Sequence, residues 1–289
     1  MNAATVAKGL RGVERVVDSQ VAPVGSFTVK RALPARERHS VGPWVFLDHF
    51  GPFKATPGVD GVGAHPHAGI ETVTYLLEGR NEHRDSAGHH GIVGAGGAQW
   101  MTAGRGIVHS EHPLDTIQHG IQLWTSLPRA QKMMPPRYQR IEGQDIPQVE
   151  RDGVRVRVIA GEFAGTQGRA ETLMPLFLWH ATLPADTRLE ARVDPAFEAA
   201  AYVIDGGGRF GGEDAIVART GQLVIWDTGE GALQAANGTA KNLELLVLGG
   251  ALAEGPLVFH GPFVMNSVEQ VRAADIAYRT GRMGELAAD

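Results

Sequence analysis

The fold is decided by a segment that occurs twice in the chain. Residues 71–79 read ETVTYLLEG and residues 198–206 read EAAAYVIDG, at a constant offset of 127 that aligns Tyr75 with Tyr202. A second pair, AGRGIVHSE at 103–111 and TGEGALQAA at 228–236, follows at an offset of 125. Self-similarity of this kind is the sequence signature of a repeated structural unit. We therefore predict two copies of one domain.

The segments around these repeats are short and apolar, and turn residues separate them. They cover residues 25–33, 44–47, 71–77, 121–127 and 154–159. The chain also contains 38 glycines and 16 prolines. Short apolar runs between frequent turns are typical of all-β proteins rather than helical ones. We therefore expect each copy to be a small β-barrel.

Chain length and proline positions predict the domain boundaries. A chain of 289 residues is long enough for two domains of moderate size. Residues 127–150 contain four prolines and several charges, so this stretch cannot continue a central strand. We predict a first domain at 1–134, a linker at 135–150 and a second domain at 151–289. One helix is expected near the end, where Ser267 and Gln270 form a capping-box pattern and Gly281 follows the helical run.

The composition excludes several classes of function. The chain has no cysteine, so disulfides and thiolate metal ligands are excluded. The net charge is −5 and no basic run could follow a phosphate backbone, so direct nucleic-acid binding is not expected. The N-terminal segment lacks the apolar core of a signal peptide, and no run approaches membrane-spanning length. We expect a soluble cytoplasmic protein with no membrane association.

Two short pairs of residues, His65-x-His67 and His109-x-Glu111, predict a divalent metal site. Side chains two apart in a strand project from the same face, so two neighbouring strands would bring three imidazoles and one carboxylate together. This ligand set suits Fe(II), Mn(II), Co(II), Ni(II) or Zn(II). A six-coordinate ion would keep two further positions for chemistry, whereas tetrahedral zinc would be saturated.

The internal repeat acts as a control for these four residues. Extending the two offsets gives Arg192, Asp194, Gln234 and Ala236 as the counterparts of His65, His67, His109 and Glu111. A structural requirement of the fold should survive in both copies, but the ligand set does not. We therefore expect a metal in the first domain only.

Glu71 competes with Glu111 for the fourth ligand position. If the strand that begins near His65 continues to Leu77, Glu71 lies on the same face as the histidines. Its counterpart Glu198 is a glutamate although the ligand set is lost there, which favours a role outside the ligand set. We predict Glu111 as the ligand and Glu71 as its hydrogen-bonding neighbour.

The other histidines show no pairing pattern that predicts a ligand. His89 and His90 are expected to form a solvated loop pair. Ordinary core or surface positions are expected for His49, His83, His112 and His119.

Four segments together resemble the pirin family of bicupins. They read HPHAGIETVTYLLEG (65–79), QWMTAGRGIVHSE (99–111), QLWTSLPRAQKMMPPRYQ (122–139) and GPFVMNSVEQVRAADIAYRTGRMG (261–284). The resemblance implies two tandem cupin barrels, with iron in the N-terminal barrel. Pirins bind this metal with the residues that match His65, His67, His109 and Glu111, whereas many cupins use a glutamate at the position of Glu71.

The resemblance implies two functions. Some pirins are similar to quercetin 2,3-dioxygenase, which opens a flavonol ring with dioxygen and releases carbon monoxide. Others resemble iron-dependent, redox-sensitive regulators that bind transcription factors or metabolic enzymes. We expect the dioxygenase, with Fe(II) as cofactor and Glu111 or Glu71 as the acceptor of the flavonol hydroxyl proton. The regulator with a protein partner ranks second, and a purely structural metal ranks third.

Overall fold

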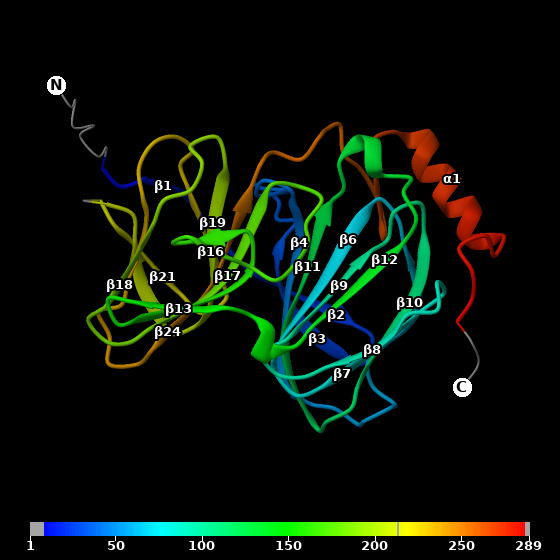
Figure 1. The fold of residues 1–289 in the computed structure, drawn as a ribbon, viewed down its shortest axis with the longest axis horizontal. Helices are drawn as coiled ribbons and strands as arrows, with labels where there is room; N and C mark the ends of the chain where they lie inside the picture. The colour runs from blue at the N-terminus through cyan, green and yellow to red at the C-terminus, as the bar shows by residue number, and fades with distance from the viewer. Residues whose placement is uncertain (1–8, 213, 287–289) are drawn as a thin grey trace.

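The computed structural model describes residues 9–212 and 214–286, which form two antiparallel β-barrels side by side (Figure 1). In the first barrel a large sheet faces a small one. The large sheet has the order β12 (Arg137–Ile141), β9 (Ala98–Thr102), β6 (Ile70–Glu78), β11 (Ile117–Ser126), β4 (Trp44–Lys54), β3 (Phe27–Leu33) and β2 (Gln20–Val24). The small sheet has the order β5 (Val62–His67), β10 (Ile107–Pro113), β7 (Asn81–Asp85) and β8 (His90–Val93).

The second barrel repeats this plan strand for strand. Its large sheet has the order β1 (Val13–Asp18), β22 (Gln222–Trp226), β19 (Glu198–Asp205), β24 (Leu243–Gly250), β17 (Leu176–Leu183), β14 (Val154–Ala160) and β13 (Gln148–Arg151). Its small sheet has the order β18 (Arg188–Ala191), β23 (Leu233–Ala236), β20 (Gly207–Phe210) and β21 (Ile216–Arg219). The two repeated segments of the sequence are β6 and β19, at equivalent positions. The predicted all-β fold of two cupin barrels is confirmed.

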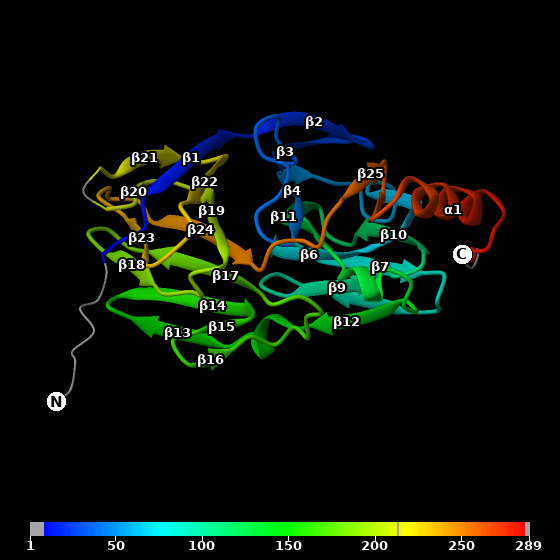
Figure 2. The same ribbon diagram turned by 90° about the horizontal axis from the view of Figure 1, so that it is seen from above.

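Both ends of the chain cross from one barrel to the other. The predicted domain boundaries did not include these two crossings. β1 pairs with β22 in the second barrel, and the chain then passes to β2 of the first (Figure 2). After β24 the chain returns to the first barrel, where β25 (Val258–His260) and β26 (Phe263–Met265) form a hairpin. The predicted linker contains β12 and most of β13, both at sheet edges, where neighbouring prolines are tolerated.

The short elements complete the chain. They are the hairpin of β15 (Glu162–Phe163) and β16 (Thr166–Gln167), the 3-10 turns Arg129–Gln131 and Gly143–Asp145, and α1 (Val268–Arg279). The predicted helix start is confirmed, because Ser267 Oγ accepts a hydrogen bond from the Gln270 amide at 3.2 Å. In the part of the chain that is described, no helix is long and apolar enough to cross a membrane.

The two large sheets pack face to face and share a single apolar core. From the first barrel this core takes Trp44, Val73, Tyr75 and Trp100, and from the second it takes Leu178, Tyr202, Ile225 and Leu246. The Trp44 indole also donates across the boundary to the Gly249 carbonyl at 3.1 Å. The face of β6 that carries Val73 and Tyr75 is therefore the interface between the barrels.

The condition that one strand continues from His65 to Leu77 is not met, because β5 and β6 are separate strands. Gly69 has a φ of +76° and lies in a turn between β5 and β6, which belong to different sheets. A Cβ at this position would lie 2.1 Å from the Val264 carbonyl oxygen, so only glycine fits. After the turn the even-numbered residues of β6, such as Thr74, face the interior of the barrel.

Candidate metal centre and its pocket

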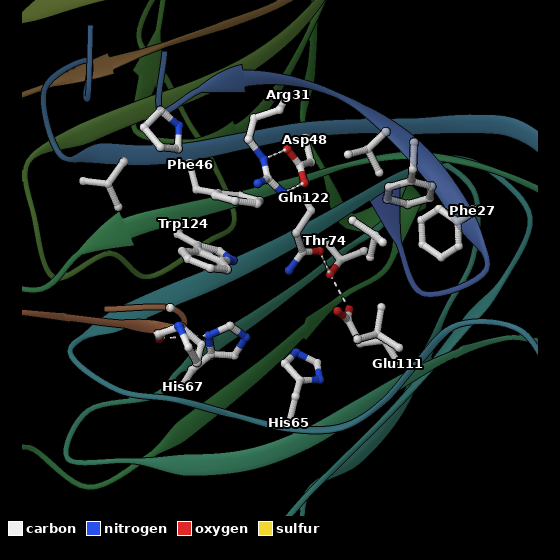
Figure 3. Close-up of a pocket in the computed structure, with 18 of the residues that line it drawn as sticks. Phe27, Arg31, Phe46, Asp48, His65, His67, Thr74, Glu111, Gln122 and Trp124 are labelled. Carbon is white, nitrogen blue, oxygen red and sulfur yellow. Dashed lines mark hydrogen bonds and ion pairs between the residues drawn. The ribbon is translucent and has the colours of Figure 1, made fainter. Parts of the chain in front are cut away.

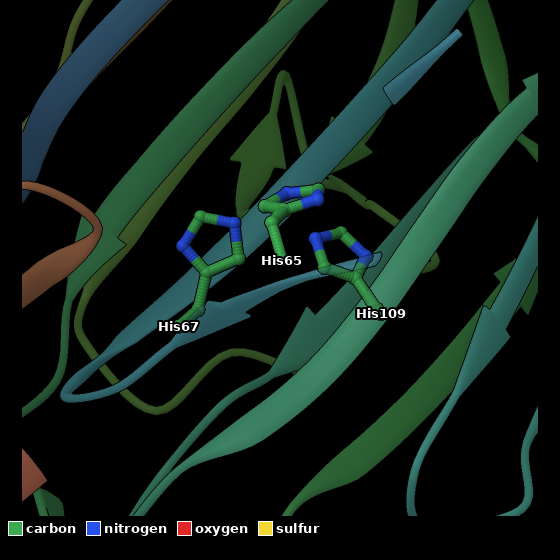
Figure 4. Close-up of side chains that lie close together, drawn as sticks. All are labelled: His65, His67 and His109. Atoms are coloured by element: carbon green, nitrogen blue, oxygen red, sulfur yellow. The ribbon is translucent and has the colours of Figure 1, made fainter. Parts of the chain in front are cut away.

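Three histidines meet inside the first barrel (Figure 4). His65 and His67 project from β5, and His109 projects from β10, where it is the ladder partner of His65. One ligand nitrogen from each ring lies within 4.8 Å of the others. The ring centroids are separated by 4.3 Å for His65 and His109, and by 4.9 and 5.0 Å for the pairs that include His67. The spacing of the two sequence pairs therefore produces a compact cluster of imidazoles.

The hydrogen bonds of these rings suit metal binding. His65 Nδ1 donates to the Gly63 carbonyl at 2.8 Å, and His67 Nδ1 donates to the Pro262 carbonyl at 3.3 Å. A carbonyl only accepts, so each neutral ring keeps the lone pair on Nε2. His109 Nε2 is buried and has no hydrogen-bond partner. Since buried polar atoms are almost always paired, this nitrogen fits a metal ligand.

Burial keeps the two innermost histidines neutral. It lowers the pKa of His67 well below the usual value, and the neighbouring His65 lowers that pKa further. Burial likewise lowers the pKa of His109, with additional contributions from His65, His67 and His83. Neutral imidazole is the form that binds metals. These two rings are therefore ready to bind a cation at neutral pH without first losing protons.

Glu111 lies on the wall of the same cavity rather than within the three-histidine group (Figure 3). Its Oε1 accepts a hydrogen bond from Thr74 Oγ1 at 2.5 Å, and Thr74 is also 2.6 Å from Gln122 Oε1. Glu111 and His65 both line the cavity, from β10 and β5. Three of the four predicted residues, His65, His67 and Glu111, thus line one cavity, and His109 joins them through the histidine cluster. The role of Glu111 as fourth ligand stays a prediction.

Glu71 lies on the opposite face of β6 from Thr74, so the expectation that it shares a face with the histidines is wrong. The turn at Gly69 is the reason, because it separates β5 from β6. Glu71 is fully buried, with its carboxylate accepting from Thr102 Oγ1 at 2.7 Å and Thr125 Oγ1 at 3.4 Å. Burial raises its pKa. These contacts are those of a buried structural carboxyl group outside the cavity.

The cavity beside the histidines has a volume of about 820 Å³, and its wall includes several aromatic side chains. Phe46 and Trp124 stack with centroids 4.0 Å apart, and the Trp124 and His67 rings form a T-shaped contact with centroids 4.9 Å apart. Phe27 and Phe53 form a second stack at 4.7 Å in the same cavity (Figure 3). Aromatic surface thus extends from the histidine cluster through the pocket, which suits a planar aromatic ligand.

A row of polar side chains crosses the large sheet of the first barrel, with one residue from each of five strands in register. In spatial order the row is Arg31, Asp48, Gln122, Thr74 and Gln99. Arg31 donates to Asp48 through Nε at 2.8 Å and Nη2 at 2.7 Å. Burial raises the pKa of Asp48, and the bonds from Arg31 oppose this effect only in part.

The second barrel has an apolar residue at every position of this row. The counterparts, in the same spatial order, are Val158, Trp179, Val247, Ala201 and Val224, all in the second barrel's core. The polar row is therefore not required by the fold. Sequence reasoning missed it because its members are far apart in the chain and align only through the strand register.

The pairing of strands in the two small sheets corrects the predicted counterparts of His65 and His67 in the second barrel. His109 pairs with His65 in the first barrel, and its counterpart Gln234 pairs with Glu190 in the second. The position of His65 therefore corresponds to Glu190, and that of His67 to Arg192, instead of Arg192 and Asp194. Three residues separate His67 from Glu71, whereas five separate their counterparts Arg192 and Glu198, so the second barrel has two more residues at this turn. The conclusion holds, because none of the corrected counterparts is a histidine.

These features define a two-barrel cupin protein whose first barrel alone has a histidine cluster among the described residues. The family model described as Pirin matches residues 26–125, and the model for the Pirin C-terminal cupin domain matches residues 178–284. The chain belongs to the pirin family.

Relatives and solved structures agree with this assignment. A pirin-like protein of Solanum lycopersicum is 38% identical over 257 residues, which cover 89% of this chain and 87% of the relative. A Pseudomonas aeruginosa protein named "Putative quercetin 2,3-dioxygenase PA3240" is 38% identical, covering 86% of this chain and 88% of its own. The crystal structure of a quercetin 2,3-dioxygenase from Acinetobacter baumannii superposes with a TM-score of 0.88 at 30% identity, covering 96% and 99% of the two chains.

Proposed function

We propose that this protein is a mononuclear metal-dependent dioxygenase that acts on flavonols such as quercetin. The observation that carries the proposal is the three-histidine cluster at an aromatic cavity, present in the first barrel and replaced in the second. The similarity to proteins named quercetin 2,3-dioxygenase supports the substrate class.

The proposed metal is Fe(II). Zn, Mn, Co and Ni are alternatives, because they also bind imidazole and carboxylate ligands. His65, His67 and His109 would hold it through Nε2, and Glu111 is the proposed fourth ligand. When bound, the ion supplies Lewis-acid polarisation of the flavonol oxygens and a redox-active centre for dioxygen chemistry.

The protein's own side chains bind and orient the substrate. The Phe46 and Trp124 stack offers a flat apolar surface next to His67, so a flavonol ring system placed there excludes water from the cluster. Arg31 and Asp48 supply charged hydrogen-bonding groups on the cavity wall. A planar ligand with hydroxyl groups can therefore meet aromatic and polar partners at once.

Glu111 is the proposed acceptor of the flavonol hydroxyl proton. Its carboxylate lines the cavity, and Thr74 orients it through the 2.5 Å hydrogen bond to Oε1. A carboxylate held beside the substrate hydroxyl can accept its proton directly. Glu71 is not included in this step, because it lies on the other face of β6.

The experiment is an oxygen-electrode assay on iron-loaded protein with quercetin, combined with detection of carbon monoxide. The proposal predicts oxygen uptake with release of carbon monoxide, and loss of both in His109→Ala. Full iron occupancy without oxygen uptake would contradict the enzymatic proposal.

A regulatory function is the second candidate, because several matched relatives are named only pirin or pirin-like. In that case a protein partner would bind with different affinities when the metal is Fe(II) or Fe(III). Equal affinities for the two oxidation states would contradict this candidate.

A further inference from the structure

His83 is a buried histidine that contacts His109 of the candidate metal centre. It projects from β7 and is 1% exposed, with its Nδ1 3.4 Å from His109 Nδ1. Its Nε2 lies 3.1 Å from Asp85 Oδ2. Its ring stacks on Tyr138 with the centroids 4.5 Å apart. Contacts on both nitrogens and on one ring face fix the orientation of His83.

Asp85 is held in place by several contacts of its own. Its Oδ1 accepts hydrogen bonds from the backbone amides of Ala87 and His89, each at 3.0 Å. The His89 ring adds a contact from Nδ1 to Oδ2 at 3.0 Å. The Asp85 side chain is itself buried. An ionised carboxylate only accepts hydrogen bonds, so the neighbouring His83 Nε2 must be the donor.

The direction of each hydrogen bond then follows in order. Neutral His83 with its proton on Nε2 has an acceptor at Nδ1. His109 Nδ1 must therefore donate to His83 Nδ1, which leaves the lone pair of His109 on Nε2. This is the buried nitrogen that has no partner and faces the other two histidines.

We propose that His83 and Asp85 are positioning residues for the metal centre: they set the tautomer and ring orientation of His109, so that Nε2 is presented to the metal. The inference rests on the proposed metal site and goes beyond it by adding two residues outside the ligand set. Carboxylate and histidine partners of this kind fix ligand orientation in metalloproteins.

The second barrel supports this role because it has lost the pair together with the ligands. Arg209 is the counterpart of His83, since it pairs with Ala236 as His83 pairs with Glu111. Gly211 is the counterpart of Asp85, since its amide donates to the Gln234 carbonyl. A histidine and an aspartate that the fold required would be expected in both barrels.

The first test reads the tautomers directly in the wild-type protein freed of metal. Nitrogen-15 NMR of the labelled histidine rings distinguishes a protonated Nδ1 from a protonated Nε2. The proposal predicts protonated Nδ1 in His109 and protonated Nε2 in His83. The reverse pattern in His109 would overturn it, and this result does not depend on any variant folding.

The second test measures the affinity for Co(II) by competition with a chelator. His83→Phe removes the acceptor and should weaken binding roughly 10- to 100-fold, the range typical of such partners. His83→Asn places an acceptor oxygen near the former Nδ1 position and should recover most of the affinity. The control is His90→Gln, an exposed histidine of the adjacent strand bonded to Glu82 at 2.7 Å, which should bind as the wild type does.

The outcomes separate the two proposals. Wild-type affinity in His83→Phe would overturn the positioning role and leave the metal site intact. A wild-type protein that binds no Co(II), Fe(II) or other divalent ion would contradict the metal site itself, and the positioning role with it. The Co(II) absorption spectrum gives a further readout, because a misoriented His109 should change it even where the metal is bound.

Discussion

At the scale of single residues, the candidate metal centre is built from side chains on neighbouring strands, with His83 and Asp85 on β7 beside His109 on β10. The x-separated pairs placed His65, His67 and His109 in one cluster because strand periodicity is local. His83 and Asp85 are also two positions apart in one strand. Their proposed role is not visible in the sequence, because it depends on the pairing of β7 with β10, which carries His109. The polar row was missed for the same reason, since it is defined only by pairing between strands.

Glu111→Gln tests the two roles proposed for this carboxylate. As a ligand, the neutral amide should lower metal affinity at least 10-fold; as a proton acceptor, it should lower kcat roughly 10²- to 10⁴-fold at full metal loading. Elemental analysis and oxygen uptake measured on the same sample separate the two effects. Thr74→Val, which removes only the supporting hydroxyl, should have a smaller effect. Unchanged affinity together with unchanged kcat would contradict both roles.

Asp48→Asn tests the polar row as a substrate-orienting surface. Losing the charged partner of Arg31 should raise KM for quercetin roughly 10-fold, because a hydrogen bond between charged groups contributes about 1.5–3 kcal/mol. The metal content should stay the same. Asp275→Asn on the exposed face of α1 is the matched control, since it removes the carboxylate of a surface ion pair with Arg279. Equal KM values in the Asp48 variant and the wild type would remove the row from substrate binding.

At the scale of elements, the hairpin of β25 and β26 connects the fold to the site. It returns from the second barrel and supplies the Pro262 carbonyl that orients His67. Lys132 anchors it, with Nζ donating to the carbonyls of Gly69 at 2.7 Å and Val264 at 2.8 Å. The sequence predicted α1 from its local cap, but a return of the chain to the first barrel has no local signal.

Lys132→Met should therefore destabilise the protein and weaken metal binding. Lys132 is fully buried, so its loss leaves buried acceptors without their donor, at about 1–3 kcal/mol each. Thermal unfolding of the metal-free protein measures the first effect, and chelator competition measures the second. Lys241→Met removes an exposed lysine paired with Asp205 and should change neither. An unchanged unfolding temperature in the Lys132 variant would be incompatible with the anchoring role.

At the scale of the whole molecule, the repeated segments predicted two barrels correctly, because each repeat includes a complete strand and its turns. They could not predict that the large sheets share one core or that β1 belongs to the second barrel. Both features depend on pairing between residues about 200 positions apart, such as Val16 and Val224. The sequence did predict that the histidine cluster lies in the first barrel alone among the described residues, since its counterparts in the second copy are not histidines.

A buried histidine at the interface between the barrels should make the stability of the folded protein sensitive to acid. His49 lies there with Nδ1 3.0 Å from the Tyr202 hydroxyl and Nε2 2.7 Å from His119 Nε2. Burial, with the nearby His119 and Lys30, lowers the pKa of His49 to about 3, although Asp205 opposes the shift. The unfolded chain therefore binds a proton near pH 6.5 that the folded protein does not bind.

This difference fixes the sign of the pH dependence. The stability from neutral His49 is present above pH 6.5 and is lost as the pH falls towards 3, with a limiting slope of about 1.4 kcal/mol per pH unit. Denaturant unfolding at pH 7 and pH 5 measures this loss. His49→Gln should reduce the slope of unfolding free energy against pH by the contribution of about one proton, about 1.4 kcal/mol per pH unit. An identical slope in wild type and variant would contradict the assignment.

The most direct measurement is the metal content per chain, by elemental analysis of the wild type and of the double variant His65→Ala and His109→Ala. We predict one divalent metal ion per wild-type chain, and no bound metal in a double variant that keeps its β-sheet circular dichroism. Retention of the metal by the folded double variant, or two ions per wild-type chain, would contradict a single centre formed by these histidines in the first barrel.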